Sequence, residues 1–229
     1  MKLVAEYIWL DSQDNLRSKT KIMNKETTET NSFFDANTYP VWNYDGSSTG
    51  QATTDNSEVL LKPVAVYPDP VRTFGYSYIV VCEHMIMGQD GNYLPDSRKS
   101  AVDIFNNSKS CGSEPMFGLE FEFFLYQKDK PLGIPNYPDS FPKPQGDYYC
   151  GIGAQNAIGR QMIEVVLNRC LHSRVEITGL NAEVAPGQWE FQVCNTGIKA
   201  CDDSIVFKYI LQRTAEDYNV DITFHPKPI

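Results

Sequence analysis

Two glutamates share one side of a predicted strand near the middle of the chain. They are Glu120 and Glu122, within residues 118–124, and residues two apart in a strand point to the same face. Apolar residues take the opposite face, and these are Leu119, Phe121 and Phe123. The alternation predicts a strand with an acidic face and a face that packs on a core.

A second pair of glutamates lies in a predicted hairpin over residues 175–193, which turns at Ala185-Pro186-Gly187. Polar residues repeat at every second position on both of its strands, and these are Asn181, Glu183, Gln188, Glu190 and Gln192. Bulky apolar neighbours take the other parity, and these are Val184, Trp189 and Phe191. Two β segments therefore each carry a pair of glutamates on a polar face.

If these carboxylates converge, their mutual repulsion must raise their pKa values or be offset by cations. Ligands that are all oxygen suit Mg²⁺ or Mn²⁺ rather than zinc. Two such ions that bridge phosphates make a phosphoryl-transfer site. The other interpretation is a polar face that only meets solvent. For any single glutamate, exposure to solvent is the preferred interpretation. Four glutamates in aromatic strands, flanked by Asn and Gln, favour a binding site.

The elements that must position these residues change in character near residue 95. Residues 1–95 are predicted to form short strands and turns, with strands at 4–10, 19–23, 58–67 and 78–82 and a turn or loop at 41–49. A helix capped by Asp96 or Ser97 is predicted to run to Phe105. Later elements are a strand at 116–126, a loop at 131–153, a helix at 154–172, a helix capped by Asp202 or Asp203 that runs to Tyr218, and a strand at 220–224. The order predicts an α+β fold behind a smaller β-rich unit.

Composition narrows the class of protein. The chain has 229 residues, of which 41% are hydrophobic, so one or two packed domains are expected. The net charge of −9 argues against nucleic acid or an anionic membrane as a main partner. We see neither a signal peptide nor an apolar run of the roughly 20 residues that a membrane span needs. With three His and no C-x-x-C pair, a zinc site or disulfide framework is not expected, and reduced thiols fit a cytosol-like compartment.

Five stretches of the sequence carry a resemblance to a known family. They are "AEYIWLD" (5–11), "WNYDGSSTGQ" (42–51), "FPKPQGDYYCGIGA" (141–154), "NAEVAPGQWEFQ" (181–192) and "TFHPKPI" (223–229). On these the chain resembles the eukaryotic-type (type II) glutamine synthetases, and the resemblance covers the N-terminal part of that family. It implies a small β-grasp-like domain at residues 1–95, followed by an incomplete catalytic α+β domain at residues 96–229.

The resemblance implies an ATP-dependent glutamate–ammonia ligase, which forms L-glutamine from L-glutamate and ammonium through γ-glutamyl phosphate. It implies Mg²⁺ or Mn²⁺ as cofactor, ATP as a substrate, a cytoplasmic location and a homo-oligomer with sites between subunits. Neither nucleic acid nor membrane is an expected partner.

Site residues carry over from the family motifs. Glu122, Glu183 and Glu190 resemble the ligands of one metal, and Glu120 resembles a ligand of a second. The residues that resemble the ammonium-binding and catalytic group are Asp45, Ser48, Tyr149 and Glu183, of which Asp45 and Ser48 serve the neighbouring subunit's site. The residues that resemble the nucleotide-binding group are Glu120, Glu190, Phe191 and Gln192.

The sequence departs from the family pattern in two ways. Met116 stands where many relatives have Trp, and Cys194-Asn195 replaces a common Gly-Pro. The chain also stops at Ile229, before the family residues that complete the second metal site and hold phosphate and glutamate. We therefore expect the isolated chain to lack synthetase activity.

Three functions remain open on the sequence alone. The first is the N-terminal part of an active glutamine synthetase. The second is a non-catalytic truncated subunit that binds or regulates complete synthetase rings, in which the Asp45 loop still completes a neighbour's site. The third is a metal- or nucleotide-binding protein that has lost the ligase reaction. Intact motif residues favour the first.

Overall fold

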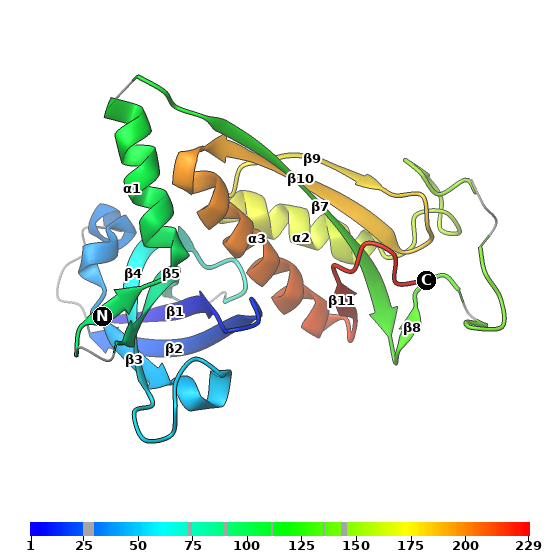
Figure 1. The fold of residues 1–229 in the computed structure, drawn as a ribbon. Coiled ribbons are helices and arrows are strands. Elements are labelled where there is room, and N and C mark those ends of the chain that lie inside the picture. Colours follow the sequence, from blue (N-terminus) through cyan, green and yellow to red (C-terminus); the bar gives the residue numbers. More distant parts are fainter. Residues whose placement is uncertain (25–29, 73–74, 89–90, 111, 135, 143–145) are drawn as a thin grey trace.

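The computed structural model describes residues 1–24, 30–72, 75–88, 91–110, 112–134, 136–142 and 146–229. Within these ranges the chain forms two β-sheets and three α-helices (Figure 1). The predicted α+β class is confirmed. Residues 143–145, which belong to the third motif stretch, and Cys111 lie outside the described residues.

The first sheet has six strands in the order β2-β1-β5-β4-β3, with β6 paired to β5. Its strands are β1 (Lys2–Leu10), β2 (Leu16–Asn24), β3 (Trp42–Asp45), β4 (Glu58–Pro68), β5 (Tyr76–Met87) and β6 (Tyr93–Pro95). β1 and β5 are parallel, and the other pairs are antiparallel. Both faces of β1 are buried, as expected for a strand covered on two sides.

The second sheet is antiparallel and has five strands in the order β11-β7-β10-β9, with β8 paired to β7. Its strands are β7 (Met116–Gln127), β8 (Lys130–Pro131), β9 (Ile177–Ala182), β10 (Gln188–Thr196) and β11 (Asp221–Thr223). The predicted hairpin is therefore β9–β10, and the predicted acidic strand is β7.

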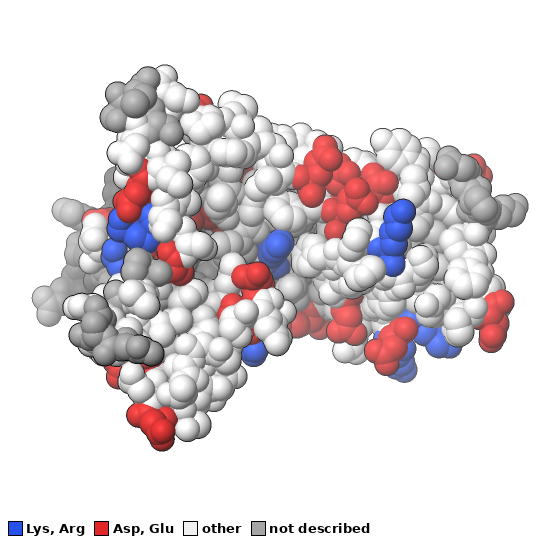
Figure 2. Space-filling model, in the orientation of Figure 1, with Lys and Arg blue, Asp and Glu red and all other residues white. Residues whose placement is uncertain are grey.

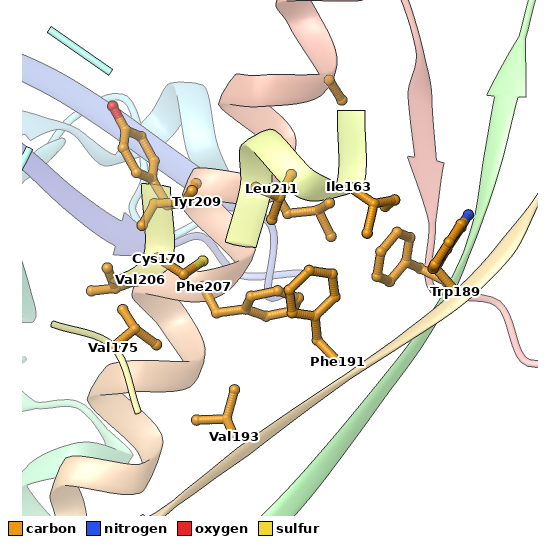
Figure 3. Close-up of a cluster of buried hydrophobic side chains, with 14 of the residues drawn as sticks. Ile163, Cys170, Val175, Trp189, Phe191, Val193, Val206, Phe207, Tyr209 and Leu211 are labelled. Atoms are coloured by element: carbon orange, nitrogen blue, oxygen red, sulfur yellow. The ribbon is translucent and has the colours of Figure 1, made fainter. Parts of the chain in front are cut away.

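Two helices lie between the sheets and join them through one core. They are α2 (Arg160–His172) and α3 (Gly197–Asp217), while α1 (Ser97–Ser110) leads from the first sheet toward β7 (Figure 1). The Phe207 ring of α3 lies 5.0 Å from Phe191 of β10 (Figure 3). It lies 5.3 Å from Phe121 of β7. Ile8 and Ile79 of the first sheet belong to the same buried cluster.

A second core covers the other face of the first sheet. There the short 3₁₀ helices η1 (Thr30–Phe34) and η2 (Ala36–Thr38) pack with Phe33 and Tyr39 against Leu3, Tyr7 and Leu61. The predicted division between residues 95 and 96 falls between β6 and α1, and it stays a prediction because the larger core draws on both sheets.

Two predicted helix starts were wrong. The helix predicted at 154–172 begins at Arg160, because its N-cap Gly159 has a φ of 85°, which interrupts the helix and favours glycine. The last helix begins at Gly197, and Asp202 and Asp203 lie inside it rather than at its cap. Both aspartates are buried and bind partners from distant elements, which local sequence does not reveal.

The segment predicted as a loop at 41–49 is more regular than expected. It consists of strand β3 and a 3₁₀ helix, η3 (Gly46–Thr49). Gly46 is required at the junction, since a Cβ there would lie 2.4 Å from Cγ2 of Val59. The other predicted strands of the first sheet are present, and each is longer than or equal to its predicted span.

Candidate active site

The register of the second sheet places the predicted acidic residues in two adjacent rows. Glu122 of β7 is the direct partner of Glu190 of β10, and Asn181 of β9 is the next residue across. In the second row Glu120 faces Gln192. Direct partners in a sheet point to the same side, so these polar side chains share one face.

The opposite face of the same strands is the core. Phe121, Phe123 and Phe191 lie there beneath α3. Phe191 is fully buried (Figure 3). The Phe191 ring lies on the side of the sheet away from the glutamates. If Phe191 helps to bind nucleotide, as expected from the motif, its ring does not take part from this side.

Each of three carboxylates receives a hydrogen bond from an amide side chain of the hairpin. Gln188 Nε2 donates to Oε2 of Glu122 at 2.8 Å, and Gln192 Nε2 donates to Oε1 of Glu190 at 2.7 Å. Asn181 Nδ2 donates to Oε1 of Glu183 at 2.9 Å. The alternation in the sequence predicted that the amides and the acids share one face. It did not predict which amide binds which acid.

Glu183 follows the last residue of β9 and lies within the field of the other acids. Its Oε2 accepts from the backbone N–H of Val184 at 3.1 Å. Burial is the largest cause that raises the pKa of Glu183, and the charges of Glu122 and Glu190 raise it further, against hydrogen bonds from Val184 and Asn181 that lower it. The predicted carboxylates therefore do interact with one another.

Tyr149 lies beside this group at the surface. The backbone N–H of Cys150 donates to the carbonyl oxygen of Ala182 at 2.9 Å, which ties the segment to the end of β9. The pKa of the Tyr149 hydroxyl is raised, first by the neighbouring Cys150 and then by the charge of Glu183. The charge of Glu183 thus acts on the Tyr149 hydroxyl, and the shared role that the motifs imply for the two residues stays a prediction.

Asp45 and Ser48 lie elsewhere in the chain. Asp45 ends β3, at one edge of the first sheet, and its Oδ1 accepts from the hydroxyl and the backbone N–H of Ser47 at 2.6 and 3.0 Å. These bonds lower the pKa of the exposed Asp45 carboxyl. Figure 1 shows this loop on the far side of the molecule from the β9–β10 hairpin. Within one chain the structure does not bring Asp45 and Ser48 to the glutamates.

Glu120 and Glu122 are exposed on the acidic face while Glu190 is only 8% exposed, and the chemistry of the face suits a hard divalent cation. Figure 2 shows acidic side chains gathered over the region where β7, β9 and β10 lie in Figure 1. The donors are carboxylate oxygens, which Mg²⁺ and Mn²⁺ prefer. Among the described residues, however, no three His, Cys, Asp or Glu side chains form a group placed to hold a metal ion. The donor types fit the metal, and each of Glu122, Glu183 and Glu190 accepts a hydrogen bond from an amide of the hairpin.

Two buried ionic networks outside the acidic face involve aspartates of α3, and the sequence interpretation missed both. Arg98 of α1 binds both oxygens of Asp202 at 2.8 Å and Glu83 of β5 at 2.8 Å. Asp203 accepts from Tyr67 of β4, from Lys199 and from Asn195. The Arg98–Asp202 and Tyr67–Asp203 pairs join residues 104 and 136 positions apart, so no local signal reveals them.

Comparison with known proteins identifies the family. Residues 95–229 match the family model described as glutamine synthetase, catalytic domain. The chain belongs to the glutamine synthetase family. Maize glutamine synthetase root isozyme 4 is 43% identical over 233 residues, which cover 100% of this chain and 62% of the maize protein. Glutamine synthetase of Kluyveromyces lactis is 43% identical over 231 residues, which cover 99% of this chain and 58% of the yeast protein.

A solved structure agrees in fold. The cryo-EM structure of Plasmodium falciparum glutamine synthetase matches with a TM-score of 0.69 at 13% identity, covering 99% of this chain and 48% of that one. The predicted resemblance to eukaryotic glutamine synthetases is thus confirmed. The chain spans less than two thirds of the length of the maize and yeast relatives. Among the described helices, none is long and apolar enough to cross a membrane.

Proposed function

We propose that this chain supplies the carboxylate face of an ATP-dependent glutamate–ammonia ligase, which joins ammonia to L-glutamate to give L-glutamine. The observation that carries the proposal is the cross-strand pair Glu122–Glu190, backed by a phenylalanine core and lying beside Glu183. Membership of the glutamine synthetase family supports this reaction over others that use paired acids.

We assign the roles of the acids from the family motifs. Glu122, Glu183 and Glu190 would hold one Mg²⁺ or Mn²⁺, and Glu120, one row away, would supply a ligand to a second. Such ions, when bound, offset the charge of the ATP phosphates. Glu120, Glu190 and Gln192 lie on the face where the nucleotide phosphates would then approach, and Phe191 would contribute through its backbone.

We place the ammonium position beside Tyr149 and Glu183, the residues that the family motifs imply. A carboxylate attracts NH₄⁺ and can accept its proton. Asp45 and Ser48 would reach such a site only from another copy of the chain, because within one chain they lie in the other sheet. We therefore propose a homo-oligomer with sites between subunits, and a cytoplasmic location.

A second candidate function is a non-catalytic subunit that joins complete synthetase rings. It is favoured by one observation: among the described residues, no three acidic side chains form a group placed to hold a metal ion. In this role the chain lends its Asp45 loop to a neighbour while its own acidic face does no chemistry. The third candidate, a nucleotide- or metal-binding protein without ligase activity, predicts ATP binding without turnover.

Co-expression with a complete glutamine synthetase separates these functions. Glutamine formation is measured for the chain alone and for mixed assemblies in which the chain is wild type, Glu190→Gln or Asp45→Asn. We expect no turnover by the chain alone. In mixed assemblies the ligase role predicts loss of activity with both variants, whereas the non-catalytic role predicts loss with Asp45→Asn alone. If neither substitution changes the glutamine formation of the mixed assemblies, both roles are contradicted.

A further inference from the structure

The amide of Gln188 is fixed in one orientation by two bonds. Its Oε1 accepts from the backbone N–H of Ala185 at 3.2 Å, and its Nε2 donates to Oε2 of Glu122 at 2.8 Å. A backbone N–H can only donate, so the oxygen must face Ala185 and the NH₂ must face Glu122. Gln188 is also buried, with 5% of its surface exposed. The hairpin turn and the Glu122 carboxylate are therefore tied together through a single side chain.

Gln188 and Gln192 hold the cross-strand acids in opposite directions. They flank Glu190 at two residues to either side on the same face of β10. Gln188 draws Glu122 toward the hairpin turn, where Glu183 lies, and Gln192 draws Glu190 toward the row of Glu120. Side chains directly opposite in a sheet have Cβ atoms about 5 Å apart. The Gln188 and Gln192 amides therefore fix the orientation of two carboxylates that would otherwise only repel each other.

Gly179 keeps the Gln192 amide flat on the sheet. A Cβ at this position would lie 2.4 Å from Oε1 of Gln192. The absence of a side chain in β9 thus leaves room for the amide that donates to Glu190. The Ala185 N–H thus orients the Gln188 amide, and Gly179 leaves room for the Gln192 amide. Both amides are held in place, as a positioning role requires.

We infer that Gln188 is a positioning residue for the proposed metal site, holding the Glu122 carboxylate at the hairpin turn so that it and Glu183 face one cation. The inference rests on the proposed function and deepens it. Gln188 occupies only part of the acceptor capacity of Glu122, since a carboxylate offers about four lone-pair sites. The remaining lone pairs would be available to a cation. Groups that orient metal ligands in this way commonly change metal affinity by 10- to 100-fold when removed.

The test is a calorimetric Mn²⁺ titration of the full 229-residue chain, paired with melting temperatures measured with and without Mn²⁺. The variant is Gln188→Met, which keeps the length of the side chain and removes its donor. The matched control is Gln127→Met, because Gln127 also ends a strand of this sheet but donates to Asn219, away from the acids. We expect the control to bind Mn²⁺ like wild type.

For Gln188→Met we expect a Kd at least tenfold higher and a smaller Mn²⁺-induced rise in melting temperature. A purely structural role would lower the melting temperature equally with and without Mn²⁺ and leave the Kd unchanged, which would overturn the inference while the proposed function stands. If wild type shows no saturable Mn²⁺ binding, both are overturned. If Gln188→Met does not fold, Gln188→Asn, which is too short to hold Ala185 and Glu122 together, is judged by the same two outcomes.

Discussion

Glu122 and Glu190 are direct cross-strand partners on the acidic face of the second sheet. Like charges in this relation oppose folding, yet the strands that carry them have a phenylalanine-rich reverse face that is buried against α3. The sheet therefore holds the acids at close range through packing on its other side. This arrangement costs stability and leaves carboxylate oxygens available to a cation.

Relief of this repulsion should stabilise the metal-free chain. Glu122→Gln keeps an acceptor for Gln188 and removes one of the opposed charges. We expect the free energy of unfolding in urea to rise by about 0.2–1 kcal/mol at low ionic strength, with a smaller gain in high salt. Glu164→Gln on the exposed side of α2 is the control and should not reproduce the gain. A loss of stability in Glu122→Gln would show that the pair is not repulsive.

The Asp11 carboxylate should make stability depend on acid pH. Its side chain is 3% exposed and lies 2.7 Å from Arg17. Burial acts to raise its pKa, but hydrogen bonds from Gln13, Asn15 and Arg17 bring the pKa below the ordinary value of 3.8. Because the folded-state pKa is depressed, the stabilisation is present above pH 3.8 and is lost as the pH falls through the folded-state value.

Asp11→Asn should therefore be less stable than wild type at pH 7, by roughly 1.5–3 kcal/mol if the charge-assisted bonds are lost. The difference should shrink as the pH falls below 3.8. Asp14→Asn makes the same chemical change three residues away, in the same turn, at an exposed position. Urea denaturation across pH 3–7 measures both. A difference that stays constant over this range would contradict the assigned pKa direction.

Tyr67 should contribute to the attachment of the first sheet to α3. Its hydroxyl donates to Oδ1 of Asp203 at 2.7 Å, and both residues are buried. Tyr67→Phe removes one hydrogen bond to a charged group, which is worth about 1.5–3 kcal/mol of unfolding free energy. Tyr78→Phe is the control, because within the described residues Tyr78 is held by its ring, against Phe33 and Phe34. Equal effects of the two changes would refute this role of Tyr67.

Local periodicity was enough to predict the acidic face. In β7 and β10 the acids and the aromatic residues alternate, and the side-chain period of a strand is two, so parity alone assigned each residue to a face. The hairpin turn was predicted because Pro and Gly interrupt the alternation between Ala182 and Gln188. The register that sets Glu122 opposite Glu190 depends on how two distant segments pair, which parity does not specify.

Helix starts were less predictable, because buried charges resemble caps in a sequence. Asp202 and Asp203 precede an apolar run and so suggested an N-cap. In the structure they lie inside α3 and bind Arg98 and Tyr67, which are far away in the chain. The true N-cap, Thr196, makes no side-chain cap bond. The position of the Asp45 loop relative to the acids likewise depends on tertiary packing, which local sequence does not reveal. Only the family motif indicated that Asp45 and the acids act in one site.

The most direct test of the central claim is an EPR titration of Mn²⁺ with the wild-type chain, Glu190→Gln and the control Glu164→Gln. Free Mn²⁺ gives a signal that falls on binding, so the readout does not depend on turnover. If the carboxylates of β7 and β10 hold the cation, wild type and the control bind Mn²⁺ saturably, and Glu190→Gln binds it at least tenfold more weakly. Absence of saturable binding in wild type, or equal affinity in all three chains, would contradict it.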